Sequence, residues 1–300
     1  MKKKTYLFAL MAMALTLGSC SDNENGIGGE TSKYITVSTS IGNMTRVATD
    51  AKGGQTFEEG DEISVYAWTG APTVAPETSE RVVNNAINKL TNGSWISTPQ
   101  MLWKNNREKH YFIGVYPTAA ISDLSAGEYT FDANKQTESD LLVAVNPDGL
   151  SYNADEQQTV PLTFTHVMAK LAVNLTYKNQ WGGIPTVEKV VVGNAAKEAT
   201  INYLTKVVTP STTAKEDFSL PEITENTKYV SVIIPQEDVK QLTIVIGGKN
   251  FVYDNGTPFK LESGKITTVN LEVGRDEIKL GDVKITNWED GSTFSGEAIN

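Results

Sequence analysis

The stretch Val160–Leu175, VPLTFTHVMAKLAVNL, is the densest apolar region of the chain and decides its interpretation. Leu162 and Phe164 alternate with polar residues, which is the period of a strand with one buried face. A second alternation starts after His166 and includes Leu171, Val173 and Leu175. Because the hydrophobic pattern restarts there, we place a boundary between two domains near residue 164.

Short apolar runs recur on both sides of this stretch, and most are separated by Gly, Pro or Asn-Gly signals. No segment shows a sustained helical period. The tripeptide Pro147-Asp148-Gly149 is expected to form a turn that reverses the chain. The runs lie at 33–41, 57–68, 111–116, 140–145, 187–192, 230–234, 242–246, 250–253 and 266–273. Regular short strands with turn signals predict an all-β protein with two tandem β-sandwich domains, 33–164 and 165–275.

The first and last apolar runs have separate interpretations. In 33–41, KYITVSTSI, one face of the expected strand carries Ile35, Val37 and Ile41. The segment 276–300 follows the last domain and carries Ile278, Leu280, Val283, Ile285 and Trp288. This segment is either a final strand packed on its own domain or a strand donated to a neighbouring molecule.

The first twenty residues have the pattern of a lipoprotein signal peptide. Lys2, Lys3 and Lys4 precede an apolar run at 6–17 that is too short to span a bilayer. The run ends in Leu17-Gly18-Ser19-Cys20, the pattern of a bacterial lipobox. We therefore expect removal of residues 1–19 and attachment of acyl chains such as palmitate to Cys20, which together give stable anchoring. The alternative is an ordinary secretory signal followed by a chance cysteine.

Composition limits what the mature chain can be. Removing residues 1–19 removes three lysines and no acids, which leaves 23 basic and 36 acidic side chains and a net charge of −13. An acidic surface repels phosphate backbones, so nucleic acid is excluded as a partner. Cys20 is the only cysteine, so no disulfide or thiolate site is expected. Residues 20–32 are polar and Gly-rich, which predicts a flexible tether.

The sequence contains no catalytic constellation. Its two histidines, His110 and His166, adjoin strand-like apolar runs, and no HExxH, GxSxG or P-loop pattern is present. We therefore predict a protein that is not an enzyme and that has no cofactor and no metal site. Two alternatives stay open. Exposed tryptophans could stack on sugars, the candidates being Trp95, Trp103 and Trp181, or distant acids could converge in a hydrolase cleft.

Taken in order, these segments resemble the fimbrillin family of Bacteroidales, the type V pilins and their relatives. The resemblance includes the lipobox, Thr45-Arg46 after the first strand, and the Gly60-Asp61 turn. It continues through Trp103, the 111–117 segment and Asp140-Leu141-Leu142, and is most specific at 162–175. The ITNWEDG element at 285–291 is similar to the ending of many members. The acidic residues at 22–24 resemble the export signal of surface lipoproteins in Bacteroidetes.

The resemblance implies two transthyretin-like β-sandwiches, display on the outer membrane and assembly into a pilus. It implies cleavage between Arg46 and Val47 by a trypsin-like protease, after which the strand with Ile35, Val37 and Ile41 is displaced. A neighbouring subunit would then donate a strand from 276–300. The implied partners are other pilin subunits, the protease, the outer membrane through the lipid, and a host glycan or protein as adhesion ligand.

Overall fold

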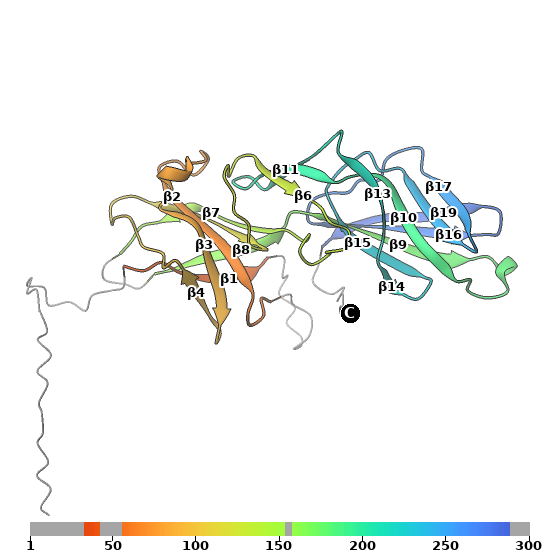
Figure 1. Cartoon of the computed structure of the whole chain (residues 1–300), viewed down its shortest axis with the longest axis horizontal. Helices are drawn as coiled ribbons and strands as arrows, with labels where there is room; N and C mark the ends of the chain where they lie inside the picture. Colours follow the sequence, from red (N-terminus) through yellow and green to blue (C-terminus); the bar gives the residue numbers. More distant parts are fainter. Residues whose placement is uncertain (1–32, 43–55, 154–157, 289–300) are drawn as a thin grey trace, which may run out of the picture.

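The computed structural model describes residues 33–42, 56–153 and 158–288, and these residues form an all-β protein, as predicted. The strands of the first half of the chain and those of the second half follow one another along the long axis of the molecule (Figure 1). Two single 3-10 turns, Thr78–Glu80 and Asn179–Trp181, are the helical elements of the described part. None of its helices is long and apolar enough to cross a membrane.

The first half forms one seven-stranded sheet in the order β1-β8-β7-β5-β2-β3-β4. Its edge strand β1 runs parallel to β8, whereas the other neighbours in this sheet are antiparallel. The bounds are β1 Thr36–Ile41, β2 Glu62–Thr69, β3 Val83–Thr91, β4 Ser94–Thr98, β5 His110–Tyr116, β7 Leu142–Leu150 and β8 Thr159–His166.

The second half forms a five-stranded sheet, β14-β15-β9-β18-β19, and a four-stranded sheet, β13-β10-β16-β17. In the five-stranded sheet, β9 and β18 are parallel. The bounds are β9 Ala169–Tyr177, β10 Val187–Ala196, β13 Lys215–Ser219, β14 Glu222–Thr224, β15 Lys228–Ile233, β16 Gln241–Ile246, β17 Lys249–Asp254, β18 Lys265–Val273 and β19 Ile278–Asn287.

A three-stranded sheet joins the two halves. It has the order β12-β11-β6, with β6 at Gly127–Thr130, β11 at Glu198–Asn202 and β12 at Val207–Pro210. Strand β6 precedes the predicted boundary near residue 164 and β11 follows it, so the ladder between them crosses that boundary. The division into domains at 33–164 and 165–275 therefore stays a prediction.

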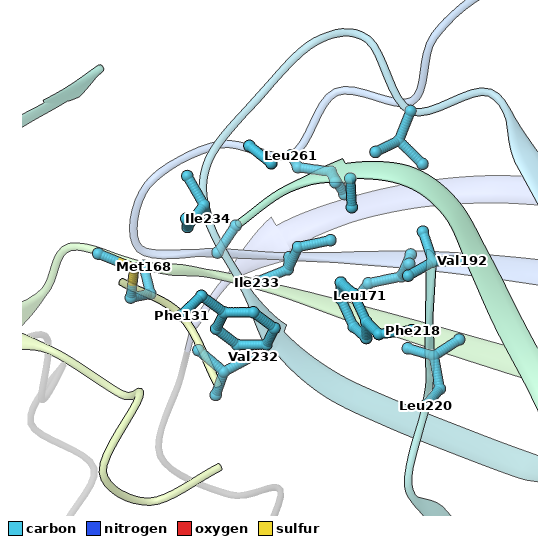
Figure 2. Packing of buried hydrophobic residues seen from close by; sticks show 14 of the residues in the cluster. Phe131, Met168, Leu171, Val192, Phe218, Leu220, Val232, Ile233, Ile234 and Leu261 are labelled. Carbon is cyan, nitrogen blue, oxygen red and sulfur yellow. The ribbon is translucent and has the colours of Figure 1, made fainter. Parts of the chain in front are cut away.

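Two hydrophobic clusters explain why the central strands of the first sheet are apolar on both faces. On β2, the side chains of Ile63, Val65 and Ala67 belong to a small core that also contains Ile35, Val37, Leu162 and Phe164. The intervening Tyr66 and Trp68 belong to a large core that continues into the second half. In that large core, the rings of Phe131 and Phe218 have centroids 5.0 Å apart, and Leu171, Val192 and Val232 belong to the same cluster (Figure 2).

One expected turn is wrong. Pro147, Asp148 and Gly149 lie inside β7, because the register between β5 and β7 shifts between the pairs Phe112–Asn146 and His110–Leu150. The extra residues form a bulge, in which the amide of Gly149 donates to Asn146 Oδ1 at 2.9 Å and Gly149 takes a φ of +64°. Turn-forming residues can thus form an irregular strand when the partner strand tolerates a bulge.

Replacing Gly114 with alanine is expected to lower the free energy of unfolding by about 2 kcal/mol, as overpacking of a filled core does. A Cβ at this position would lie 2.6 Å from Cζ of Phe164 and 3.1 Å from Cδ1 of Leu162. Urea unfolding measures the loss. Phe164→Leu replaces the opposing ring with a shorter aliphatic side chain. The double variant is therefore expected to lose less unfolding free energy than the sum of the losses in the two single variants.

Alkaline pH is expected to destabilise the fold through its buried tyrosines. Burial raises the pKa of Tyr116 to about 12, with Asp61 adding to the shift, and burial raises the pKa of Tyr203 to about 12. The unfolded chain ionises these phenols near their usual pKa of 10.0. Their contribution to stability is therefore complete below pH 10 and is lost as the pH rises towards 12. Urea unfolding across this range, with phenolate absorbance as the second signal, measures it; an unfolding free energy unchanged up to pH 12 would contradict the expectation.

Candidate functional site

Strand β1 is an edge strand that nevertheless carries core residues. Ile35 and Val37 are 2% and 6% exposed and belong to the small core, and Ile41 packs against it while half-buried. The polar residues between them face outwards, as their alternation predicted. The strand expected at 33–41 is thus found at 36–41, and Ile35, just before it, shares the inward face that completes the small core.

Contacts other than the β8 ladder also hold β1 and the residues just before it. The amide of Trp103 donates to the carbonyl of Lys33 at 3.2 Å, and Tyr34 forms an isolated antiparallel bridge with Leu102. The amide of Ile35 donates to the carbonyl of Met101 at 2.9 Å, and the amide of Gly42 donates to the carbonyl of Phe164 at 2.7 Å. On the side away from β8, the indole Nε1 of Trp95 on β4 donates to Thr39 Oγ1 at 3.0 Å. This bond links the two edges of the seven-stranded sheet.

A groove of about 630 Å³ lies along β1. The described residues of its lining carry hydroxyl, aliphatic and aromatic side chains and no charged group. They are Thr36, Val37, Ser38, Thr39, Ser40, Ile41, Thr56, Phe57, Leu90, Gly93, Ser94, Trp95 and Thr159. The ring of Phe57 contacts Trp95 and Phe164 edge to face, with centroids 5.3 and 5.1 Å apart. The groove therefore opens directly above the small core.

The opposite end of the chain forms a second edge strand. Strand β19 pairs antiparallel with β18, its own neighbour in sequence, with a bulge between Leu280 and Asp282. Leu280 and Val283 stand opposite Leu271 and Val269, which are 1% and 0% exposed, so the apolar side chains of β19 point to the core side of the sheet. This was the first of the two alternatives for the 276–300 segment. Residues 289–300 lie outside the described part.

The inward face of β19 is only partly covered. Leu280, Val283 and Ile285 are 39%, 39% and 40% exposed, although they share a face with fully buried residues of β18. Ile278 is half-buried, and Trp288, just after the strand, is 3% exposed. An apolar row with this exposure at a free sheet edge is a surface that a partner can bury.

The structure separates the arginines by accessibility. Arg81 is 8% exposed, and its Nη1 and Nη2 donate to the carbonyls of Ile121 and Ser122 at 2.6 and 2.5 Å. Arg107 and Arg275 are exposed. The predicted cleavage residues Arg46 and Val47, and the predicted lipidation residue Cys20, lie outside the described residues.

The three tryptophans considered for sugar binding do not form one platform. Trp103 is 8% exposed and packs edge to face on His110 and Phe112. Trp181 is half-buried, and its indole donates to the carbonyl of Val273 at 3.0 Å. Of the three, Trp95 lines the groove.

The two histidines have structural partners. Burial lowers the pKa of His110, whose Nε2 accepts the amide of Lys104 at 3.1 Å. His166 Nδ1 lies 2.8 Å from Asp140 Oδ1. Within 33–42, 56–153 and 158–288, no group of three or more His, Cys, Asp or Glu side chains is placed to hold a metal ion.

Sequence reasoning missed the contacts that hold the two edge strands. The bond between Trp95 and Thr39, and the placement of Trp288 beside His166 and Lys170, join residues far apart in the chain. Lone tryptophans at the ends of short strands were the available signal, but alternation alone does not tell which distant strand a tryptophan meets.

Comparison with known proteins gives a consistent result. The fold is similar to crystal structures of proteins proposed to act in cell adhesion from Bacteroides uniformis (17% identity, 86% of this chain and 100% of that chain, TM-score 0.60) and Bacteroides ovatus (18%, 85% and 98%, 0.62). It is also similar to a fimbrial protein from Bacteroides vulgatus (13%, 86% and 100%, 0.53). No curated protein sequence matches this chain. The sequence model of a family described as fimbrillin-like matches residues 45–288, more than half of the chain, and the chain therefore belongs to the fimbrillin-like family.

Proposed function

We propose that this protein is a structural subunit of a cell-surface pilus with a role in adhesion. In this proposal it is exported as a lipoprotein through Cys20 to the outer membrane, cleaved after Arg46, and assembled by strand exchange. Its partners are other pilin subunits, a trypsin-like protease, the membrane through the lipid, and a host glycan or protein. Membership of the fimbrillin-like family and the structural likeness to fimbrial and cell-adhesion proteins support this role.

The observation that carries the proposal is the difference between the two edge strands. The segment 33–41 buries Ile35 and Val37, and β1 within it forms a ladder with β8 alone among the described strands. Loss of this segment would expose Val160, Leu162 and Phe164 on β8. An open groove and an unpaired edge are both costly. Strand β19 carries alternating apolar residues that its own subunit leaves about 40% exposed. Inserted beside β8 of a neighbour, such a strand supplies ladder hydrogen bonds and burial together.

A head-to-tail contact of this kind does not have to close on itself. The groove of one subunit and the strand of the next are different surfaces, so each added subunit presents a new groove or strand. Heterologous contacts that do not close propagate as filaments. The proposed mechanism therefore leads to a linear polymer.

The test uses the mature chain without lipid and an arginine-specific protease. Of the four arginines in the sequence, Arg81 is buried and hydrogen-bonded, and Arg107→Lys and Arg275→Lys remove the two that the structure shows exposed, so Arg46 and the buried Arg81 remain. We expect one cut, between Arg46 and Val47 by mass spectrometry, followed by polymer growth in light scattering. The same chain with Arg46→Lys is the uncut control. A clean cut whose product stays monomeric would overturn strand exchange.

The donor strand is tested by substitutions that the monomer tolerates. Ile285→Asp changes a side chain that is 40% exposed in its own subunit but would be buried in a neighbour's groove. We expect cleavage as before and no polymers. Lys284→Asp, on the adjacent exposed position, is the matched control and should polymerise. Equal polymerisation of both variants would exclude β19 as the donor.

A second candidate function is glycan binding in the groove along β1. The described lining of the groove carries no charge, is rich in hydroxyl groups and includes Trp95 and Phe57, and aromatic rings can stack on sugars. Titration of oligosaccharides against tryptophan fluorescence tests this candidate, with Trp95→Ala as the control. Saturable binding lost in that variant would favour it, and binding unchanged by the substitution would place the sugar elsewhere.

A further inference from the structure

Trp288 is buried at the end of an exposed strand. Nine of the ten residues of β19 are exposed, and Ile278 is half-buried, whereas Trp288 is 3% exposed. Its amide donates to the carbonyl of Gly264 at 3.0 Å, just before β18 begins. Trp288 is therefore the one residue of the segment 278–288 whose side chain its own subunit buries completely, while Leu280, Val283 and Ile285 stay about 40% exposed.

Two buried side chains of the central apolar stretch receive the indole. The ring of His166 stacks on the ring of Trp288 with centroids 4.0 Å apart and planes 8° from parallel. Nζ of Lys170 lies over the ring, 4.0 Å from its centroid. His166 and Lys170 are 8% and 3% exposed. Stacking and a desolvated cation over an indole face are both attractive, and the cation is more effective away from water.

The site is built by elements from both halves of the chain. His166 ends β8, Lys170 lies near the start of β9, and Asp140, whose Oδ1 is 2.8 Å from His166 Nδ1, precedes β7. The contact with Asp140 fixes the plane of the imidazole on which Trp288 stacks. The end of β19 is thus held at the junction between the first sheet and the five-stranded sheet.

The same site contains a feature that favours release. Nε1 of Trp288 is buried and has no hydrogen-bond partner among the described residues. A buried donor without a partner loses the hydrogen bond that water would supply. The indole is therefore held by its ring faces and not by its polar atom, and leaving the site restores a hydrogen bond to Nε1.

We propose that Trp288 is a latch that keeps β19 on β18 of its own subunit, and that its departure from His166 and Lys170 frees β19 for a neighbour. The second half of this inference rests on the proposed function. The first half concerns the uncleaved monomer alone. The hydrogen-bond ladder between β18 and β19 positions β19, and the indole of Trp288 determines how often β19 detaches from β18.

The latch is tested by amide hydrogen exchange in the mature, uncleaved chain. Trp288→Ala is expected to speed exchange of β19 amides by about tenfold or more, while β9 and β15 in the same molecule keep their protection. Lys170→Met keeps the aliphatic stem but removes the cation, and an intermediate increase is expected. Trp95→Ala, which removes the tryptophan contact of β1, is the matched control and should leave β19 unchanged.

Equal amide exchange rates for β19 in Trp288→Ala and in the parent chain would overturn the latch. An increase in exchange that is as large in β9 and β15 as in β19 would overturn it as well. If Trp288→Ala does not fold, Trp288→Phe replaces it, and a selective but smaller rise in β19 exchange is expected. The absence of that rise would also overturn the latch. Failure of the proposed function is separate: polymers would then be missing after cleavage of the parent chain, whatever the exchange of β19.

Discussion

A chain that begins at Val47 is expected to lose about 3–5 kcal/mol of unfolding free energy relative to the mature protein, because two buried aliphatic side chains leave the small core. Ile35 and Val37 are 2% and 6% exposed, and their loss also leaves the β8 edge unpaired. Urea unfolding of both chains measures the difference. Equal stability of the two chains would show that β1 contributes nothing to the core.

Peptides then show which strand can replace β1. A peptide of residues 33–46 is expected to restore stability to the truncated chain as its concentration rises, because a ligand of the folded state stabilises it by mass action. A peptide of residues 276–300 should do the same if it can occupy the groove. The 276–300 peptide with Ile285→Asp is the control. Rescue by the first peptide but not the second would leave β1 as a core strand and would argue against the donor.

Replacing Arg81 with leucine is expected to lower the free energy of unfolding by about 3 kcal/mol, since it breaks several charge-assisted hydrogen bonds in a buried place. Its guanidinium donates to the carbonyls of Ile121 and Ser122 and to Asn84 Oδ1, and it lies 5.4 Å from the centroid of the Tyr66 ring. Urea unfolding measures the loss, and faster proteolysis around Ile121 and Ser122 should accompany it.

The controls for Arg81 separate geometry from charge. Arg81→Lys keeps the charge but cannot reach two carbonyls with one planar group, so it is expected to recover less than half of the loss. Arg107→Leu removes an exposed arginine and should change stability by no more than about 0.5 kcal/mol. A lysine variant as stable as the parent would show that charge alone is sufficient at this position.

The predictable part of the fold was the strands whose alternation is regular. The strand expected within 57–68 is an example: Ile63, Val65 and Ala67 alternate with Tyr66 and Trp68 along β2, and the two sets belong to different cores. Strand β3 was not predicted, because asparagines interrupt its apolar pattern. Strand β6 has four residues, too few for a period to be recognised.

The candidate site was predictable as strands but not as contacts. Residues Ile35, Val37 and Leu280 could be assigned from alternation, because alternation is a local property of the chain. The groove along β1 and the ring contacts of Trp288 arise from pairing between distant segments. Local sequence patterns do not determine which distant strands pair. Alternation also does not indicate that the apolar side chains of β19 are left about 40% exposed.

The parallel pairing of β1 with β8 also determines when β1 can fold. Thr36 and Thr159, which face each other in this pair, are 123 residues apart in the chain. The antiparallel pairs among β2, β3, β4, β5, β7 and β8 close shorter loops, and short loops close at a lower entropic cost. Strand β1 precedes the other strands of this sheet along the chain, but it must wait for β8 before it can pair. The first strand of the chain is therefore among the last to join its sheet, and losing it would reverse a late folding step while the remaining sheet stays in place.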